Sequence, residues 1–98
     1  MKIRVIFQAQ LRTVSRVSEA TCECPADATL FDLLTDLATE YGADHSTSLR
    51  PHLLAANGNV RPSLLLIVNN AAVSSSQAAT CRLSDGDCVT LMPPIGGG

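Results

Sequence analysis

The chain has 98 residues, 46% of them hydrophobic and 3% aromatic, with a formal net charge of -2. This composition suits one domain with an aliphatic core, and it argues against nucleic acid or an anionic membrane as the main partner. No signal-peptide core is visible and the longest apolar run, residues 64–68, is far shorter than a membrane span, so we expect a cytoplasmic protein.

Alternating residues predict two strands at the start of the chain. In residues 2–7, Ile3, Val5 and Phe7 share one face, as in a half-buried strand. Residues 17–24 alternate again until Pro25, which cannot donate a ladder hydrogen bond. We interpret residues 7–16 as a turn region that joins the two strands as a hairpin.

Residues 28–42 carry the pattern of the main helix. Thr29 is a good N-cap, and Asp32 stands where a capping box places its second partner. Apolar residues recur at helical spacing and predict one buried face, formed by Leu30, Leu33, Leu34, Leu37 and Tyr41. Gly42 is a natural stop after the last turn.

The second half predicts short elements. A helical turn is expected around residues 49–56, with Pro51 tolerated in its first turn, and the Asn-Gly-Asn sequence at 57–59 predicts a turn. Residues 64–69 predict a central strand covered on at least one face. Asn69-Asn70 then suits a tight turn before a short edge strand.

Asp85-Gly86 predicts a turn before the last strand, at residues 88–92. This order of elements indicates an α+β protein with the β-grasp fold of ubiquitin, a mixed sheet of four to five strands with one main helix packed across it. We expect residues 1–92 to form this single domain, with the first and last strands side by side in its centre. A ferredoxin-like arrangement fits the order less well, because it requires a second full helix.

Metal and acid–base sites find little support in the sequence. No cysteine pair has the Cys-x2-Cys spacing typical of zinc sites, so we predict no metal and interpret all four as free thiols: Cys22, Cys24, Cys81 and Cys88. His45 and His52 accompany no nucleophile signature, and we interpret both as solvated loop histidines.

The C-terminal residues 93–98 form a tail of unusual composition. Pro93-Pro94 favours a stiff, extended chain, and Gly96, Gly97 and Gly98 follow as a thread without side chains. Such a thread can enter a narrow channel and bring its terminal carboxylate to a buried reaction centre. After adenylation, that carboxylate can accept sulfur or an amine.

Three motifs resemble those of the MoaD/ThiS ubiquitin-like sulfur carriers, and MoaD, the small subunit of molybdopterin synthase, in particular. Residues 7–12 (FQAQLR) are similar to the family's FFAxLRE opening, and residues 65–74 (LLIVNNAAVS) resemble its AVNxxxV strand. Residues 83–98 (LSDGDCVTLMPPIGGG) resemble its LxDGDEVAxxPPVxGG ending. The Pro-Pro pair favours the molybdopterin branch over the thiazole branch.

The resemblance implies a carrier that is not itself an enzyme. Gly98 would be the site of adenylation and thiocarboxylate formation, with Gly96, Gly97, Pro93 and Pro94 forming the tail. Partner-binding residues would be Arg12, Met92 and Ile95. The implied partners are the large subunit of molybdopterin synthase, an E1-like adenylating enzyme that uses ATP, and a sulfur donor, with no cofactor bound tightly to the chain.

Other functions stay open on the sequence. The same tail suits a ubiquitin-like modifier joined to lysines of other proteins, or a sulfur carrier for tRNA thiolation, cysteine synthesis or thiazole synthesis. A plain interaction domain with an inert tail is a third class. Lys2 is the only lysine, which limits self-acylation under either of the first two functions.

Overall fold

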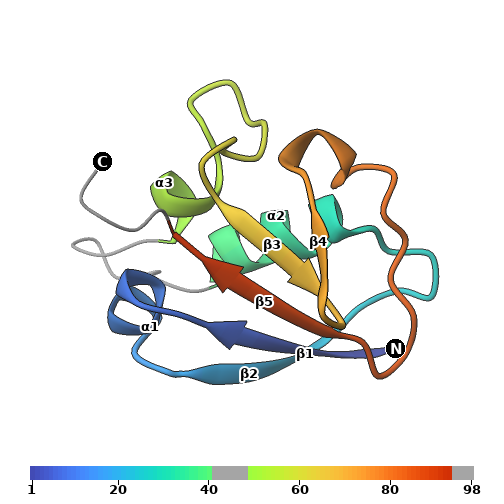
Figure 1. The fold of residues 1–98 in the computed structure, drawn as a ribbon. Coiled ribbons are helices and arrows are strands. Elements are labelled where there is room, and N and C mark those ends of the chain that lie inside the picture. The colour runs from blue at the N-terminus through green and yellow to red at the C-terminus, as the bar shows by residue number, and fades with distance from the viewer. Residues whose placement is uncertain (41–48, 94–98) are drawn as a thin grey trace.

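The computed structural model describes residues 1–40 and 49–93, which form a five-stranded sheet with one main helix packed across it (Figure 1). The strands are β1 (Lys2–Phe7), β2 (Glu19–Glu23), β3 (Leu65–Val68), β4 (Ala71–Val73) and β5 (Cys88–Met92). The helices are α1 (Gln10–Ser15), α2 (Leu30–Glu40) and α3 (Arg50–Leu53), with a 3-10 turn, η1, at Ser75–Gln77.

The strands lie in the order β2-β1-β5-β3-β4. β1 and β5 are parallel, with Arg4 opposite Cys88 and Phe7 opposite Leu91, whereas every other neighbouring pair is antiparallel. The expected pairing of the first and last strands is therefore confirmed. The predicted strand at 64–69 is β3, which lies inside the sheet, although the middle position belongs to β5.

The interpretation of residues 7–16 as a turn region was wrong, because this segment contains α1. The helix lies between Ala9 (φ 51°) and Arg16 (φ 67°), two non-glycine residues with positive φ, of which Arg16 is in the left-handed helical region. Its Leu11 is fully buried. Six residues are too few to show a helical repeat, so tertiary burial of Leu11 rather than a sequence pattern explains this helix. The pairing of β1 with β2 is still as predicted.

The predicted capping box at the start of α2 is confirmed. The Thr29 N–H donates to Asp32 Oδ2 (3.0 Å), and the Asp32 N–H donates to Thr29 Oγ1 (3.2 Å). Tyr41 and Gly42, expected to end the helix, lie outside the described residues. None of the helices within residues 1–40 and 49–93 is long and apolar enough to cross a membrane.

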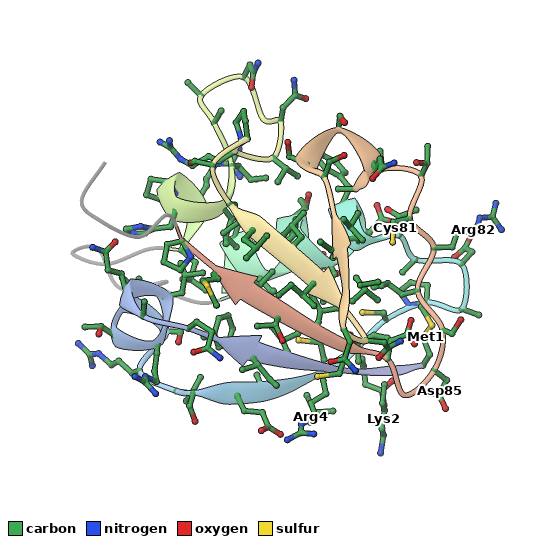
Figure 2. The ribbon with its side chains drawn as sticks, viewed as in Figure 1. Met1, Lys2, Arg4, Cys81, Arg82 and Asp85 are labelled. Atoms are coloured by element: carbon green, nitrogen blue, oxygen red, sulfur yellow. The ribbon has the colours of Figure 1, made fainter. Side chains whose placement is uncertain are left out.

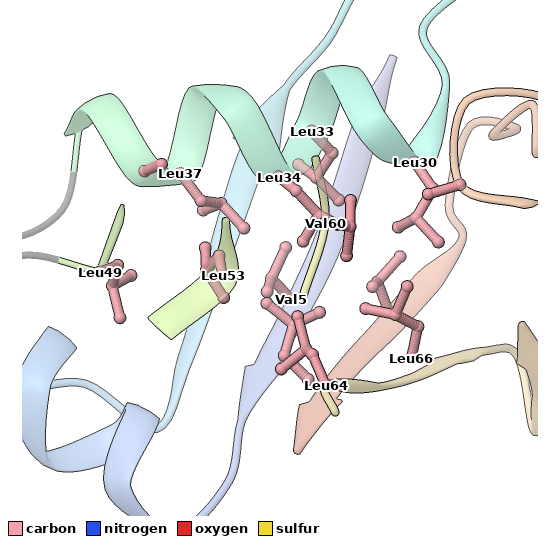
Figure 3. Packing of buried hydrophobic residues seen from close by; sticks show 14 of the residues in the cluster. Val5, Leu30, Leu33, Leu34, Leu37, Leu49, Leu53, Val60, Leu64 and Leu66 are labelled. Carbon is pink, nitrogen blue, oxygen red and sulfur yellow. The ribbon is translucent and has the colours of Figure 1, made fainter. Parts of the chain in front are cut away.

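The core lies between α2 and the inner face of the sheet (Figure 3). The predicted apolar face of α2 is buried: Leu30, Leu33 and Leu34 have no exposed area and Leu37 has 1%. The other buried residues of this core come from the sheet and from the segment that precedes β3, and they include Val5, Leu49, Leu53, Val60, Leu64, Leu66, Val89 and Leu91. Burial of such aliphatic side chains contributes about 1.5–3 kcal/mol each.

The predicted tight turns are confirmed by their backbone angles. Asn69 and Asn70 have φ of 50° and 76°, the left-handed pair that a two-residue hairpin turn requires, and they connect β3 to the edge strand β4. Gly86 has φ of 87° and reverses the chain before β5. The helical turn expected at 49–56 is α3, with Pro51 in its first turn.

We expect Thr29→Ala to lower the free energy of unfolding by about 1 kcal/mol, because it leaves a helix N–H without its capping acceptor. Thr39→Ala is the matched control, since Thr39 is exposed later in the same helix. Urea unfolding monitored by circular dichroism measures both. Equal stability of the two variants would show that the capping box does not stabilise α2.

Cys24 is a buried thiol of the core, with 5% of its surface exposed. Burial, followed by the nearby Asp36 carboxylate, raises the pKa of this thiol above its usual value. As the pH rises past the ordinary thiol pKa of about 8.5, the unfolded chain loses this proton while the folded chain keeps it. Stability must therefore fall as the pH rises from there through the higher, folded-state pKa.

Cys24→Ala should consequently flatten the decline of the thermal unfolding midpoint between neutral and alkaline pH, even though it also removes some packing. Cys88→Ala is the control, because Cys88 is only partly buried. Parallel pH profiles for the wild type and both variants would contradict this assignment of the alkaline sensitivity to Cys24.

Candidate functional site

The C-terminal tail begins where β5 ends. Pro93, the last described residue, is buried directly after Met92. The Gln8 N–H donates to the Leu91 carbonyl (3.1 Å), which joins this end of β5 to the segment leading into α1. Pro94, Ile95, Gly96, Gly97 and Gly98, the other predicted tail residues, lie outside the described residues.

The attachment point of the tail is firmly held, because β5 is paired along both of its edges. β1 bonds one edge in parallel and β3 bonds the other in antiparallel orientation. A strand with both edges paired opens less readily than an edge strand. The chain beyond Pro93 therefore starts from a fixed position beside α1 and α3 (Figure 1).

Four apolar side chains and one threonine lie in two adjacent rows on the face of the sheet away from α2. Cross-strand pairing places Ile6, Thr90 and Ile67 in one row and Met92 beside Leu65 in the next, because paired residues share a face. We call these five residues the outer patch. Leu65 is 42% exposed, and the other four are half-buried. Exposed apolar groups gathered in this way are typical of protein-binding surfaces.

An ion pair borders the outer patch on the side of β2. Arg4 Nε and Nη2 donate to the two carboxylate oxygens of Glu19 at 2.6 and 2.9 Å. The hydrogen bond from Arg4 lowers the pKa of the Glu19 carboxyl, so this group is ionised at neutral pH. The pair is exposed and hence adds little stability. It places fixed charges at the rim of an apolar surface.

Arg12 and Met92, both predicted to bind partners, lie at the same end of the sheet. Arg12 is exposed on α1, just after β1 ends, and Met92 is the last residue of β5. Ile6, Leu65 and Ile67 were not predicted as partner-binding residues. For Leu65 and Ile67 the signal was the continuous apolar run at 64–68, which supplies apolar side chains to both faces of a strand that α2 covers on one face only.

The described histidine and thiols do not assemble into another site. His52 lies in α3 and not in the expected loop, and His45 lies outside the described residues. Within residues 1–40 and 49–93, no three metal-ligating side chains come together. The four cysteines are free thiols, as predicted.

Comparison with known proteins gives a consistent result. A family model described as ThiS family matches residues 5–98. The chain is 30% identical to small archaeal modifier protein 3 of Haloferax volcanii, with both chains covered completely. It is 24% identical to a molybdopterin synthase sulfur carrier subunit of Drosophila melanogaster, covering all of this chain and 92% of that one.

Among solved structures, the crystal structure of SAMP1 from Haloferax volcanii is similar with a TM-score of 0.84 and 22% identity, and both chains are covered completely. This likeness concerns the fold alone. Together with the sheet order and the single long helix of the described residues, it confirms the predicted ubiquitin-like β-grasp fold.

Proposed function

This chain belongs to the ThiS family, and on that premise we propose that it is a sulfur carrier whose Gly98 is adenylated and converted to a thiocarboxylate. The observation that supports the proposal best is the Pro-Pro and glycine ending, which follows the doubly paired strand β5 and lies within the residues that the family model matches. A fixed strand followed by side-chain-free residues suits delivery of a carboxylate into a narrow active site.

The chemistry has two steps, and both take place on a partner enzyme. The Gly98 carboxylate attacks the α-phosphate of ATP, and pyrophosphate leaves as the acyl-adenylate forms. A sulfur nucleophile such as hydrosulfide then attacks the carbonyl carbon and displaces AMP, leaving a thiocarboxylate. An E1-like enzyme holds ATP in this proposal, and the chain itself is a carrier and not a catalyst.

For the sulfur acceptor, we propose the precursor of molybdopterin, held by the large subunit of molybdopterin synthase. The relative in Drosophila melanogaster is named as a sulfur carrier subunit of that synthase, and the Pro-Pro pair agrees with this branch. The outer patch and Arg12, together with Ile95, which follows Met92 by three residues in the sequence, would dock against the large subunit. The binding of the large subunit and of the adenylating enzyme would take place in the cytoplasm.

A second function, protein modification, is favoured by one observation. The relative that is 30% identical over the whole chain is named as a modifier protein. Modification uses the same acyl-adenylate, with an amine in place of sulfur as the nucleophile. The two functions therefore share the activation step and differ only in what attacks Gly98.

Gly97→Val should slow activation strongly while leaving the fold intact. A β-branched side chain widens the thread, and forcing it into a close-fitting channel costs about 1–3 kcal/mol, which corresponds to a loss of about 5- to 150-fold in rate. ATP–pyrophosphate exchange with the adenylating enzyme measures the loss. Deleting Gly98 should also prevent the mass gain expected when one C-terminal oxygen becomes sulfur.

The control is Ala79→Val, which creates the same β-branched side chain at an exposed position between η1 and β5. Circular dichroism and thermal unfolding should be unchanged in both valine variants. If Gly97→Val shows wild-type rates of ATP–pyrophosphate exchange and of sulfur transfer, the absence of a side chain at Gly97 is not required, and the carrier function would have to be withdrawn.

Arg12→Glu should weaken binding of the large subunit by about tenfold, equivalent to about 1.4 kcal/mol, because a reversed charge would then border the docking surface. Arg82→Glu makes the same charge change at an exposed position near the other end of the sheet (Figure 2). Isothermal titration calorimetry compares the two. Similar affinities for both variants would show that partners do not dock near Arg12.

A further inference from the structure

Lys2 is the only lysine of the chain, and the structure presents it as a free amine on a fixed backbone. Its side chain is exposed at the start of β1 and projects away from the ribbon (Figure 2). The Lys2 N–H donates to Asp85 Oδ1 (2.7 Å), and the Lys2 carbonyl accepts from the Gly86 N–H (2.8 Å). The ion pairs within the described part of the chain do not include the Lys2 ammonium.

The competing amine of the chain is engaged in the fold. The Met1 amino group donates to the Cys24 carbonyl (2.6 Å) and lies 3.8 Å from a carboxylate oxygen of Glu23. The Met1 side chain beside it is 6% exposed. An incoming carbonyl carbon would have to displace these contacts, whereas it can approach the Lys2 side chain from open solvent.

Lys2 and the tail lie at opposite ends of the sheet, because β1 and β5 are parallel. Arg4 pairs with Cys88, so Lys2 is level with Gly86, and Pro93 lies seven residues further along β5 and its extension. At about 3.3 Å per residue this separation is about 23 Å. The five residues after Pro93 span at most about 18 Å when fully extended.

A Gly98 carbonyl could therefore reach Lys2 of its own copy only with the tail and the lysine side chain both stretched back along the sheet. That path conflicts with a tail held in the active site of an adenylating enzyme. Lys2 of another copy meets no such limit. Lys2 also lies four residues before Ile6 on β1, about 13 Å away, so a partner on the outer patch can leave it uncovered.

We propose that Lys2 is an acylation site, through which the activated Gly98 of one copy joins to a second copy in linear, head-to-tail chains. This inference rests on the proposed activation of Gly98. The neutral Lys2 Nζ attacks the carbonyl carbon of the acyl-adenylate, the bond from that carbon to the AMP oxygen breaks, and AMP leaves. The new amide nitrogen loses a proton to solvent, and ATP has supplied the activation with release of pyrophosphate.

Two variants separate the donor and acceptor roles. Lys2→Arg keeps the charge but has no lysine to acylate, so it serves only as a donor. A chain lacking Gly98 keeps Lys2 but cannot be activated as proposed, so it serves only as an acceptor. Mixed with the adenylating enzyme and ATP, without sulfide, this pair should give a dimer and no higher species on denaturing gels after reduction.

The wild type alone should give a ladder under the same conditions, and Lys2→Arg alone should stay monomeric with unchanged ATP–pyrophosphate exchange. Peptide mapping of the dimer should locate the new bond between Gly98 and Lys2 Nζ. The matched negative control is the donor mixed with a chain that carries Lys2→Arg and lacks Gly98, which should give no dimer.

Normal pyrophosphate exchange without a dimer, a ladder that persists in Lys2→Arg, a bond mapped to the Met1 amine, or a cyclised monomer would each overturn this inference while leaving the carrier function intact. Absence of exchange in the wild type would overturn the proposed activation of Gly98, and this inference with it.

Discussion

The parallel pairing of β1 with β5 is the constraint on which the rest of the structure depends. Parallel neighbours cannot be joined by a tight turn, so the chain must cross over the sheet between them. α2 lies in this long connection, between β2 and β3, and its apolar face packs on the inner face of the sheet. The pairing also places β5 in the middle of the sheet, so that the tail starts from a strand that is paired along both edges.

The two faces of the sheet differ in exposure because, among the described elements, α2 covers the inner face and leaves the outer face open. The inner face and α2 form the core, in which Val5, Leu66 and Leu91 have no exposed area. The outer face carries apolar residues that no described element covers, bordered by the Arg4–Glu19 ion pair. The apolar area that stays exposed on this face adds nothing to the burial that stabilises the isolated fold, which is consistent with a surface that binds a partner.

Sulfur transfer and protein modification differ less than their products suggest. In the proposed function both would start from an activated carboxylate at Gly98, and the nucleophile that attacks it would determine the product. The fold affects this competition by distance, because Lys2 and Pro93, where the tail starts, lie at opposite ends of the sheet. It also makes one amine less accessible, because the Met1 amino group donates a hydrogen bond to the Cys24 carbonyl.

The elements that could be predicted from the amino-acid sequence alone are those whose signals lie within a few neighbouring residues. Period-two alternation predicted β1 and β2, the Thr29–Asp32 capping box predicted the start of α2, and the Asn69-Asn70 and Asp85-Gly86 pairs predicted turns, because each depends on residues close together in the chain. The tail motif was equally local. The central pairing of the first and last strands was predicted only with knowledge of related folds, since this pairing joins residues far apart in the chain.

In contrast, α1 and the outer patch depend on contacts between segments that are distant in the sequence, so they could be identified only in the three-dimensional structure. α1 forms because the fold buries Leu11. Its six residues are too few to show the helical period of apolar residues that would predict a helix. The outer patch exists because pairing aligns Ile6, Ile67 and Met92 from three separate strands and leaves their face uncovered. The separation of Lys2 from the tail follows in the same way, from the parallel direction of two strands that are distant in sequence.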